Sequence, residues 1–244
     1  MMHLAADALV LSARAHGEHG AVVRGFTRDD GVRPGYVRGG HSRRLRASLQ
    51  PGNVVRGDWR ARSDEQLAAL TIDLVHSRAP LFAQPLPAAA IEWLCALTAG
   101  ALPEAQPYPR LHDTLAAVFD AIEAAPSARG WAGSVARYEL LLLAELGFGL
   151  DLGSCTVSGA RDDLAYVSPR SGAAVSRAGA LGYETRLLAL PPFLLSGGAA
   201  TWDEVLAALT LTGHFLARDV LVDRRRDLLA ARERLVARLA RAVA

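Results

Sequence analysis

The strongest constraint on the fold is a series of short alternating segments at the N-terminus. Over the first 77 residues, apolar and polar positions alternate, and turn-forming residues interrupt them at intervals that suit short strands. We expect five strands, at residues 8–14, 21–28, 32–38, 54–62 and 67–76. Five antiparallel strands in so short a segment predict a small closed barrel. The OB-fold is the five-stranded barrel that binds oligonucleotides.

The fourth of these segments shows the alternation most clearly. Side chains change faces at every residue of a strand. The residues predicted to face a core are Val55, Gly57, Trp59 and Ala61. Those predicted to face outwards are Arg56, Asp58, Arg60 and Arg62.

Beyond residue 77 the apolar residues recur at a spacing of three and four, which indicates helices. We expect helices at 86–102, 111–125, 134–146, 201–218 and 224–243. Ser134 is the expected N-cap of the third helix and Gly147 its stop, and Thr201 to Glu204 form a capping box. The expected fold class is a multidomain α+β protein, with a barrel over 1–78 and a helical domain over 79–150 and 193–244.

The charge is distributed unevenly along the chain. Residues 1–62 hold 11 arginines against 5 acidic residues, whereas residues 63–244 hold 16 arginines against 20 acidic residues. A basic segment attracts nucleic acid or an anionic surface, and nucleic acid is favoured because strands carry this charge.

Several functional classes are excluded or disfavoured. The chain contains no lysine, so a Walker P-loop, a Schiff-base enzyme and a protein kinase are excluded, because each needs one. The longest uncharged runs are interrupted by Pro191-Pro192 or Gly197-Gly198, or are far shorter than the roughly 20 apolar residues of a spanning helix. Two cysteines, Cys95 and Cys155, imply no disulfide framework and favour the cytoplasm.

Residues 36–46 form the candidate binding segment. They place four arginines and a histidine around two glycines, and we expect a loop after a strand. Glycine lets a backbone approach a phosphate, and guanidinium groups bind its oxygens bidentately. An ordinary solvated loop is the alternative, but the basic surroundings favour a polyanion site. Tyr36 is expected to stack on a base. The residues expected to contact the sugar-phosphate backbone are Arg14, Arg24, Arg38, His41, Arg43, Arg44, Arg46 and Arg56.

No catalytic site is expected. His16 and His19 lie in a glycine-rich turn without a nearby acid-rich set, so a structural role is favoured over a metal pair. His214 lies on an apolar helix face that favours packing. Asp29-Asp30 and Asp162-Asp163 are interpreted as turn residues. A small hydrolase or transferase with a dispersed site therefore stays a weak alternative, and an RNA-binding OB module on a helical scaffold is the main one.

Several segments, in this order, resemble the RecO family of recombination mediators. They are residues 8–14, His16-Gly-Glu-His19, Phe26-Thr-Arg28, Val37-Arg-Gly-Gly-His41, Leu49-Gln-Pro51, and residues 145–152, 164–172 and 209–216. The resemblance spans nearly the whole chain. It implies an N-terminal OB domain that binds single- and double-stranded DNA, a helical domain and a zinc-finger-like insert, here residues 151–192. It also implies a non-enzymatic, cytoplasmic and nucleoid-associated protein that is not bound to a membrane.

The resemblance further implies partners and a task. The task is to anneal single strands and, with RecR, to load RecA onto DNA that is coated with single-strand-binding protein. The helical domain would accept the acidic, apolar C-terminal tail of single-strand-binding protein. Possible anchors for that tail are Arg218, Arg224, Arg225 and Arg226, although a solvated helix end explains these arginines equally well.

The residues of the insert indicate whether the chain is expected to bind a metal. Some members of the family carry four cysteines that suit zinc, and the matching positions here are Cys155, Ser158, Ser176 and Gly179. One thiol, two hydroxyls and a glycine do not form a zinc site. We therefore expect no metal and no cofactor, and an insert held together by packing of Leu164, Tyr166 and Val167.

Overall fold

The computed structural model describes residues 2–40, 42–63, 66–125, 127–222 and 226–242, with the backbone alone at Arg44 and Arg226. The chain divides into two compact units, residues 1–124 and 125–244. Among the described residues, no helix combines the length and the apolar character that crossing a membrane requires.

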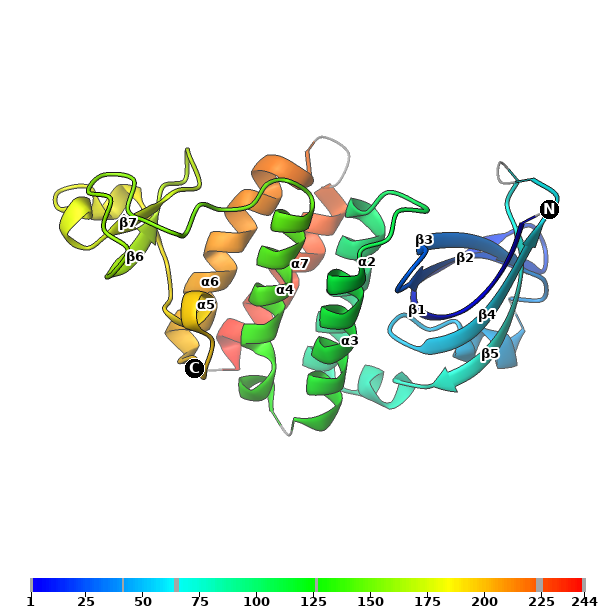
Figure 1. The fold of residues 1–244 in the computed structure, drawn as a ribbon. Helices are drawn as coiled ribbons and strands as arrows, with labels where there is room; N and C mark the ends of the chain where they lie inside the picture. The colour runs from blue at the N-terminus through cyan, green and yellow to red at the C-terminus, as the bar shows by residue number, and fades with distance from the viewer. Residues whose placement is uncertain (1, 41, 64–65, 126, 223–225, 243–244) are drawn as a thin grey trace. The chain divides into compact units, whose positions relative to one another are not determined.

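The first unit begins with a closed barrel, blue to cyan in Figure 1. Its strands are β1 (Met2–His16), β2 (Gly20–Thr27), β3 (Gly31–Val37), β4 (Val54–Ala61) and β5 (Ala69–His76). They close in the order β1-β2-β3-β5-β4, as an OB-fold. The five predicted strands are confirmed, although β1 begins six residues earlier and ends two residues later than predicted, at Met2 and His16.

The barrel closes at an uneven seam. Four neighbouring pairs of strands are antiparallel and register along most of their length, whereas β3 meets β5 in parallel at one pair, Tyr36 and Ala69. The Tyr36 amide donates to the Ala68 carbonyl there, at 2.7 Å. The seam therefore has far less backbone pairing than the rest of the barrel.

The barrel core surrounds Trp59, which is 1% exposed. Along β4 the buried and exposed positions alternate as the sequence predicts, with Val55, Gly57 and Trp59 inside. A side chain at Gly35 would collide with Trp59 and with Leu70 across the seam, so only glycine fits there.

A short helix, α1 (Arg43–Ser48), replaces part of the loop that the sequence predicts. The Ser42 hydroxyl caps it by accepting from the Leu45 amide at 3.4 Å. At its other end the amide of buried Asn53 donates to the carbonyls of Ala47 (2.9 Å) and Ser48 (3.1 Å). The expectation of a loop up to residue 46 is therefore wrong, because a polar contact from the start of β4 supports a helical turn.

Two longer helices, α2 (Pro85–Ala101) and α3 (Pro109–Ala124), follow the short helix η1 (Ala79–Ala83). Arg78 connects this part to the barrel. Its amide donates to the Asn53 carbonyl oxygen Oδ1 at 2.8 Å, its guanidinium donates to the Gly52 carbonyl at 2.7 Å, and it pairs with Asp120 of α3.

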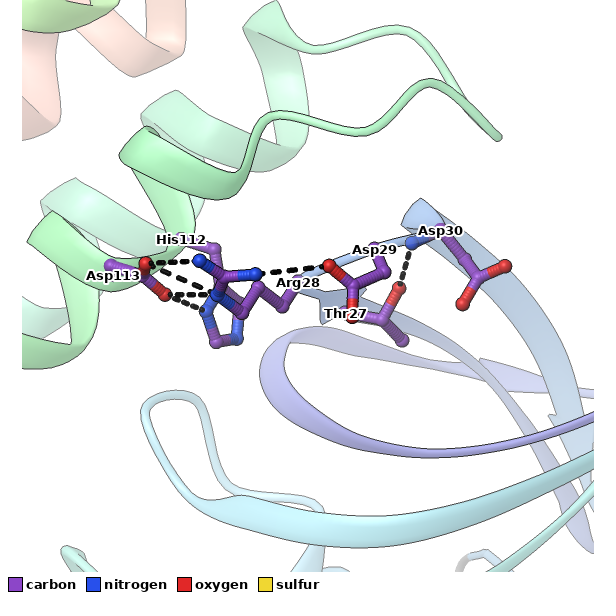
Figure 2. A network of polar contacts seen from close by, with 6 residues as sticks. All are labelled: Thr27, Arg28, Asp29, Asp30, His112 and Asp113. Atoms are coloured by element: carbon purple, nitrogen blue, oxygen red, sulfur yellow. Dashed lines mark hydrogen bonds and ion pairs between the residues drawn. The ribbon is translucent and has the colours of Figure 1, made fainter.

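The turn between β2 and β3 is joined to α3 by a second polar network (Figure 2). Arg28 forms a bidentate pair with Asp113, with its Nε and Nη2 nitrogens about 3 Å from the carboxylate oxygens, and also contacts Asp29. His112 contacts the same carboxylate at 3.3 Å and lies edge-on against buried Phe26. The barrel and α3 are thereby tied together at two separate places.

The second unit contains the helices α4 (Ala132–Glu145), α5 (Phe193–Ser196), α6 (Trp202–Phe215), the π-helical turn η5 (Leu216–Val220) and α7 (Arg226–Arg241), after the short turn η2 (Ala128–Gly130). The capping box at Thr201 is confirmed, and Gly147 follows the end of α4 with φ 87°. The N-cap of α4 is Trp131, so the prediction of Ser134 is wrong. Ser134 lies inside the first turn, where its amide donates to the Trp131 carbonyl at 2.9 Å.

A buried ion pair connects three helices of this unit. Arg232 of α7 forms two hydrogen bonds with Glu139 of α4, at 2.9 and 2.7 Å, and Glu139 also accepts from Thr212 of α6. Glu139 and Thr212 are fully buried. Gly213 leaves the room that the Arg232 guanidinium occupies.

The insert is a small sheet of order β7-β6-β8, formed by β6 (Leu164–Val167), β7 (Ala174–Ser176) and β8 (Leu188–Ala189), with the turns η3 (Ala178–Ala180) and η4 (Glu184–Arg186). Three of the four positions that were considered as zinc ligands from the sequence, Ser158, Ser176 and Gly179, lie around the fourth, Cys155. The Ser176 hydroxyl donates to its sulfur at 3.4 Å, and the Ser158 amide lies 3.5 Å from the sulfur. Leu164 and Tyr166 pack against this cluster, and Val167 is buried.

Candidate nucleic-acid interface

One outer face of the barrel gathers basic and aromatic side chains from three strands. Arg14 of β1 is opposite Val22 of β2, which is opposite Tyr36 of β3. Cross-strand partners share a face of the sheet, and the alternate residues Val23 and Val37 belong to the core. The row of Arg14, Val22 and Tyr36 therefore faces away from the core.

Tyr36 is held in a defined position on this face. Its ring lies over Gly20, where a side chain would collide with it, and makes an edge contact with His16, with the ring centroids 6.0 Å apart. His16 thus joins the candidate site, although the sequence suggested a turn role for it. The signal was its even spacing from Arg14 along an alternating strand.

Arg56 is exposed but paired with Asp7. Four other predicted arginines are exposed: Arg14, Arg38, Arg43 and Arg46. No acidic partner is found for any of them within the described part of the chain. The sequence contains no acidic residue between Asp30 and Asp58, which explains this local excess of positive charge. Such guanidinium groups have open donors for phosphate oxygens.

Two predicted contacts have partners inside the protein instead. Arg24 lies 3.2 Å from Glu104, and Arg56 lies 3.1 Å from Asp7 on the neighbouring strand β1. Both pairs join residues that are far apart in sequence, so local charge counting could not reveal them. Arg24 keeps its place on the outer face of β2, but its charge is compensated.

His41 lies outside the described residues, and so does the side chain of Arg44. The two belong to the segment that separates β3 from β4, next to Arg43. Arg43 and Arg46 line one groove together with Ala13 and Ala15. Arg14 and Tyr36 lie on the opposite, outer face of the sheet, and Arg38 directly follows β3.

A groove of about 830 Å³ lies beside the basic segment. It is lined by Ala13, Ala15, Ala21, Gly40, Arg43, Arg46, Ala47, Leu49, Gln50 and Pro51. Sequence reasoning did not identify it, because it forms only where the end of the β1–β2 hairpin faces α1. Among the described residues, the groove lining contains two cations and no acidic residue.

The face that β1 and β4 share differs in character. Asp58 contacts both His3 (3.2 Å) and Arg60 (2.8 Å). The hydrogen bonds from Arg60 and then from His3 lower the pKa of Asp58 to about 2. Positive and negative charges are matched here, so this face attracts a polyanion less than the face that bears Arg14 and Tyr36.

Arg218, expected at a partner surface, is exposed but has several contacts within its unit. Its guanidinium pairs with Asp219 and donates to the carbonyls of Pro169 (2.7 Å) and Arg170 (2.9 Å). It also lies 4.6 Å from the centroid of the Phe215 ring. Arg224 and Arg225 lie outside the described residues, as does the side chain of Arg226.

The pKa values of the two cysteines are shifted in opposite directions. Hydrogen bonds from Ser158 and Ser176 lower the pKa of Cys155 to about 6, whereas burial raises the pKa of Cys95 to about 12. Among the described residues, no cluster of three or more His, Cys, Asp or Glu side chains could hold a metal ion. His214 is half-buried, and its Nε2 lies 3.0 Å from the Pro169 carbonyl, which agrees with a packing role.

A closed OB barrel with a basic outer face, followed by a helical unit with a small inserted sheet, defines a class of protein built for oligonucleotides. Residues 1–78 match the model of the recombination protein O N-terminal family, and residues 85–228 match that of the recombination protein O C-terminal family. The chain belongs to the RecO family of DNA repair and recombination proteins.

Individual relatives align over almost their whole length. The DNA repair protein RecO of Rhodospirillum centenum is 47% identical over 97% of this chain and 94% of its own. The RecO proteins of Gluconacetobacter diazotrophicus and Phenylobacterium zucineum are 46% and 45% identical, over 96% and 97% of this chain and 94% and 97% of their own.

Proposed function

We propose that this protein is a non-enzymatic recombination mediator of the cytoplasm and nucleoid. It anneals complementary single strands and, together with RecR, helps to load RecA onto DNA that is coated with single-strand-binding protein. The observation that carries the proposal is a set of exposed arginines on an OB barrel, for which the described part of the chain holds no acidic partner, together with the outward-facing ring of Tyr36. Family membership supports the role in DNA repair.

The proposed DNA contacts combine charge and stacking. Arg14, Arg38, Arg43 and Arg46 bind phosphates, with His41 and Arg44 of the same segment, and Tyr36 and His16 offer rings on which a base can stack. Neither kind of contact depends strongly on base identity, because every nucleotide has a phosphate and a π-face. Weak sequence preference and annealing of any complementary pair are the expected result.

Strand annealing by the purified chain, with and without single-strand-binding protein, tests this function. We expect faster annealing of two complementary oligonucleotides than without the chain, and continued annealing when single-strand-binding protein coats them. A chain that neither binds nor anneals single strands would refute the proposal. Tighter binding to single-stranded RNA than to DNA of equal length would favour the RNA-binding alternative.

A pair of matched double variants tests the proposed contacts. R43A/R46A removes two arginines that have no acidic partner among the described residues. R56A/R60A removes two exposed arginines that are paired with Asp7 and Asp58. Each phosphate contact contributes about 0.7 to the slope of log affinity against log salt on single strands. We expect R43A/R46A to make that slope shallower by about 1.4 and R56A/R60A to leave it nearly unchanged. Equal slopes for the two variants would remove α1 from the interface.

We also propose that the helical unit receives the acidic tail of single-strand-binding protein at Arg224, Arg225 and Arg226, next to Arg218. The contacts of Arg218 use four of the five N–H donors of its guanidinium, so its main role is to hold the insert against η5. Titration of a labelled tail peptide should therefore show weaker binding by an Arg224 to Arg226 triple alanine variant than by Arg218→Ala. Unchanged peptide binding by the triple variant would contradict this assignment.

A further inference from the structure

The groove beside α1 forms because β1 extends beyond the point where its pairing with β4 ends. Leu9 is the last residue of β1 that pairs with β4, whereas pairing with β2 continues to His16. Beyond Leu9, one edge of the β1–β2 hairpin is therefore not paired with β4, next to the inner face of β1. Ala13 and Ala15 lie on that face, opposite Val23 and Ala21, and both are exposed.

Small side chains keep the groove open. Ala13 and Ala15 line one wall, and Ala47 of α1 lines another. Gly40 packs against Ala21, and a Cβ atom at position 40 would lie only 2.7 Å from the Ala21 methyl group. The volume of about 830 Å³ lies within the usual range of small-ligand sites, roughly 300–1,000 Å³.

The chemistry of the lining selects the ligand. Methyl groups and the ring of Pro51 provide an apolar surface, and the Gln50 amide offers both a donor and an acceptor to a base edge. Arg43 and Arg46 provide positive charge, and neither has an acidic partner among the described residues. An apolar planar group attached to a phosphate fits this combination.

We propose that the groove is a nucleotide slot, which takes one unpaired base of a single strand while Arg43 and Arg46 bind the adjoining phosphates. This rests on the proposed function and adds a second contact surface to it, on the other side of the hairpin from Tyr36. A base in a duplex has to leave its stack before it enters, which costs free energy. The slot therefore favours single strands over duplexes.

Filling the slot tests the inference. Ala15→Trp places a large ring inside it, and Ala5→Trp is the matched control, because Ala5 is an exposed alanine on the same strand, opposite Asp58. We expect A15W to weaken binding of single-stranded DNA about tenfold, the scale of one lost base contact, and A5W to leave it unchanged. The salt slope should stay the same in A15W, because no phosphate contact is removed.

Two modified oligonucleotides report on the base itself. The described residues that line the slot include no aromatic side chain, so a 2-aminopurine base that enters it leaves its stacked neighbours, and its fluorescence rises on binding. This rise should be present with wild type and A5W and absent with A15W. An oligonucleotide of abasic sites should bind wild type more than tenfold more weakly than normal DNA does, because it also lacks a base to stack on Tyr36. It should bind wild type and A15W equally. Should A15W fail to fold by circular dichroism, Ala47→Trp fills the slot from α1 and carries the same test.

The outcomes separate this inference from the proposed function. Wild-type protein that binds single strands, together with equal affinity and equal 2-aminopurine fluorescence for A15W and A5W, overturns the slot and leaves the annealing function standing. Wild-type protein that does not bind single strands overturns the proposed function itself.

Discussion

Replacement of Asn53 by alanine should destabilise the barrel and loosen α1. The Asn53 side chain is fully buried and makes three hydrogen bonds. Its amide donates to two carbonyls at the end of α1, and its oxygen accepts from the Arg78 amide. Each such bond contributes about 1 kcal/mol net, so Asn53→Ala should lower the free energy of unfolding by about 3 kcal/mol.

Urea unfolding and hydrogen exchange measure this effect. With a denaturant dependence of about 2 kcal/mol per molar urea, the unfolding midpoint of the first unit should fall by about 1.5 M. Amides at the end of α1, such as that of Leu49, which donates to the Leu45 carbonyl at 2.9 Å, should exchange faster than in wild type. DNA affinity should also fall, because α1 carries Arg43 and Arg46.

Gln50→Ala provides the control for Asn53→Ala. Gln50 lies three residues earlier, is half-buried, and has no side-chain hydrogen bond within the described part of the chain. We expect it to change stability by less than about 0.5 kcal/mol. A similarly small effect of Asn53→Ala would refute the view that this side chain supports α1.

Three further predictions follow from other polar clusters. Arg232→Met should destabilise the second unit by about 3–5 kcal/mol in urea unfolding, because it leaves Glu139 charged and buried; a loss below 1 kcal/mol would contradict this. Burial lowers the pKa of His112, so its contribution to stability is present above the unfolded pKa of about 6.5 and is lost as pH falls through the folded pKa. His112→Phe should therefore narrow the gap between melting temperatures at pH 7.5 and pH 5.5, and an unchanged gap would refute this. Cysteines at the three positions that surround Cys155 should create a tetrahedral thiolate site, detected as one zinc per chain in a dye assay against a metal-free wild type; no bound zinc would count against the geometry. The substitutions are S158C, S176C and G179C.

The barrel could be predicted because its signals are local. Alternation along β4 put Trp59 in the core, and turn residues separated the strands correctly. The helix α1 was missed because its six residues are too few to show a helical period, and its support comes from Asn53, which lies beyond its end. Ser134 was misplaced as an N-cap by three residues, which is the usual uncertainty of a helix boundary.

The candidate site, too, could be predicted only where its features depend on the local sequence. Exposure of Arg14, Arg38, Arg43 and Arg46 agrees with the reading of local charge. The partners of Arg24 and Arg56 come from distant segments, Glu104 and Asp7, and the groove requires the hairpin to meet α1. These features depend on tertiary contacts, which a single sequence does not specify.

The uneven closure of the barrel has a consequence for its motion. Breathing of the structure should begin where β3 meets β5, because few backbone hydrogen bonds must break there. Tyr36 lies at this seam between β3 and β5. The ring proposed to stack on a base therefore belongs to the part of the barrel that is expected to open first. A DNA strand bound across β3 and β5 would hold these two β-strands together. It would therefore slow the amide exchange of Tyr36 more than that of the amides in the β1–β4 pairs.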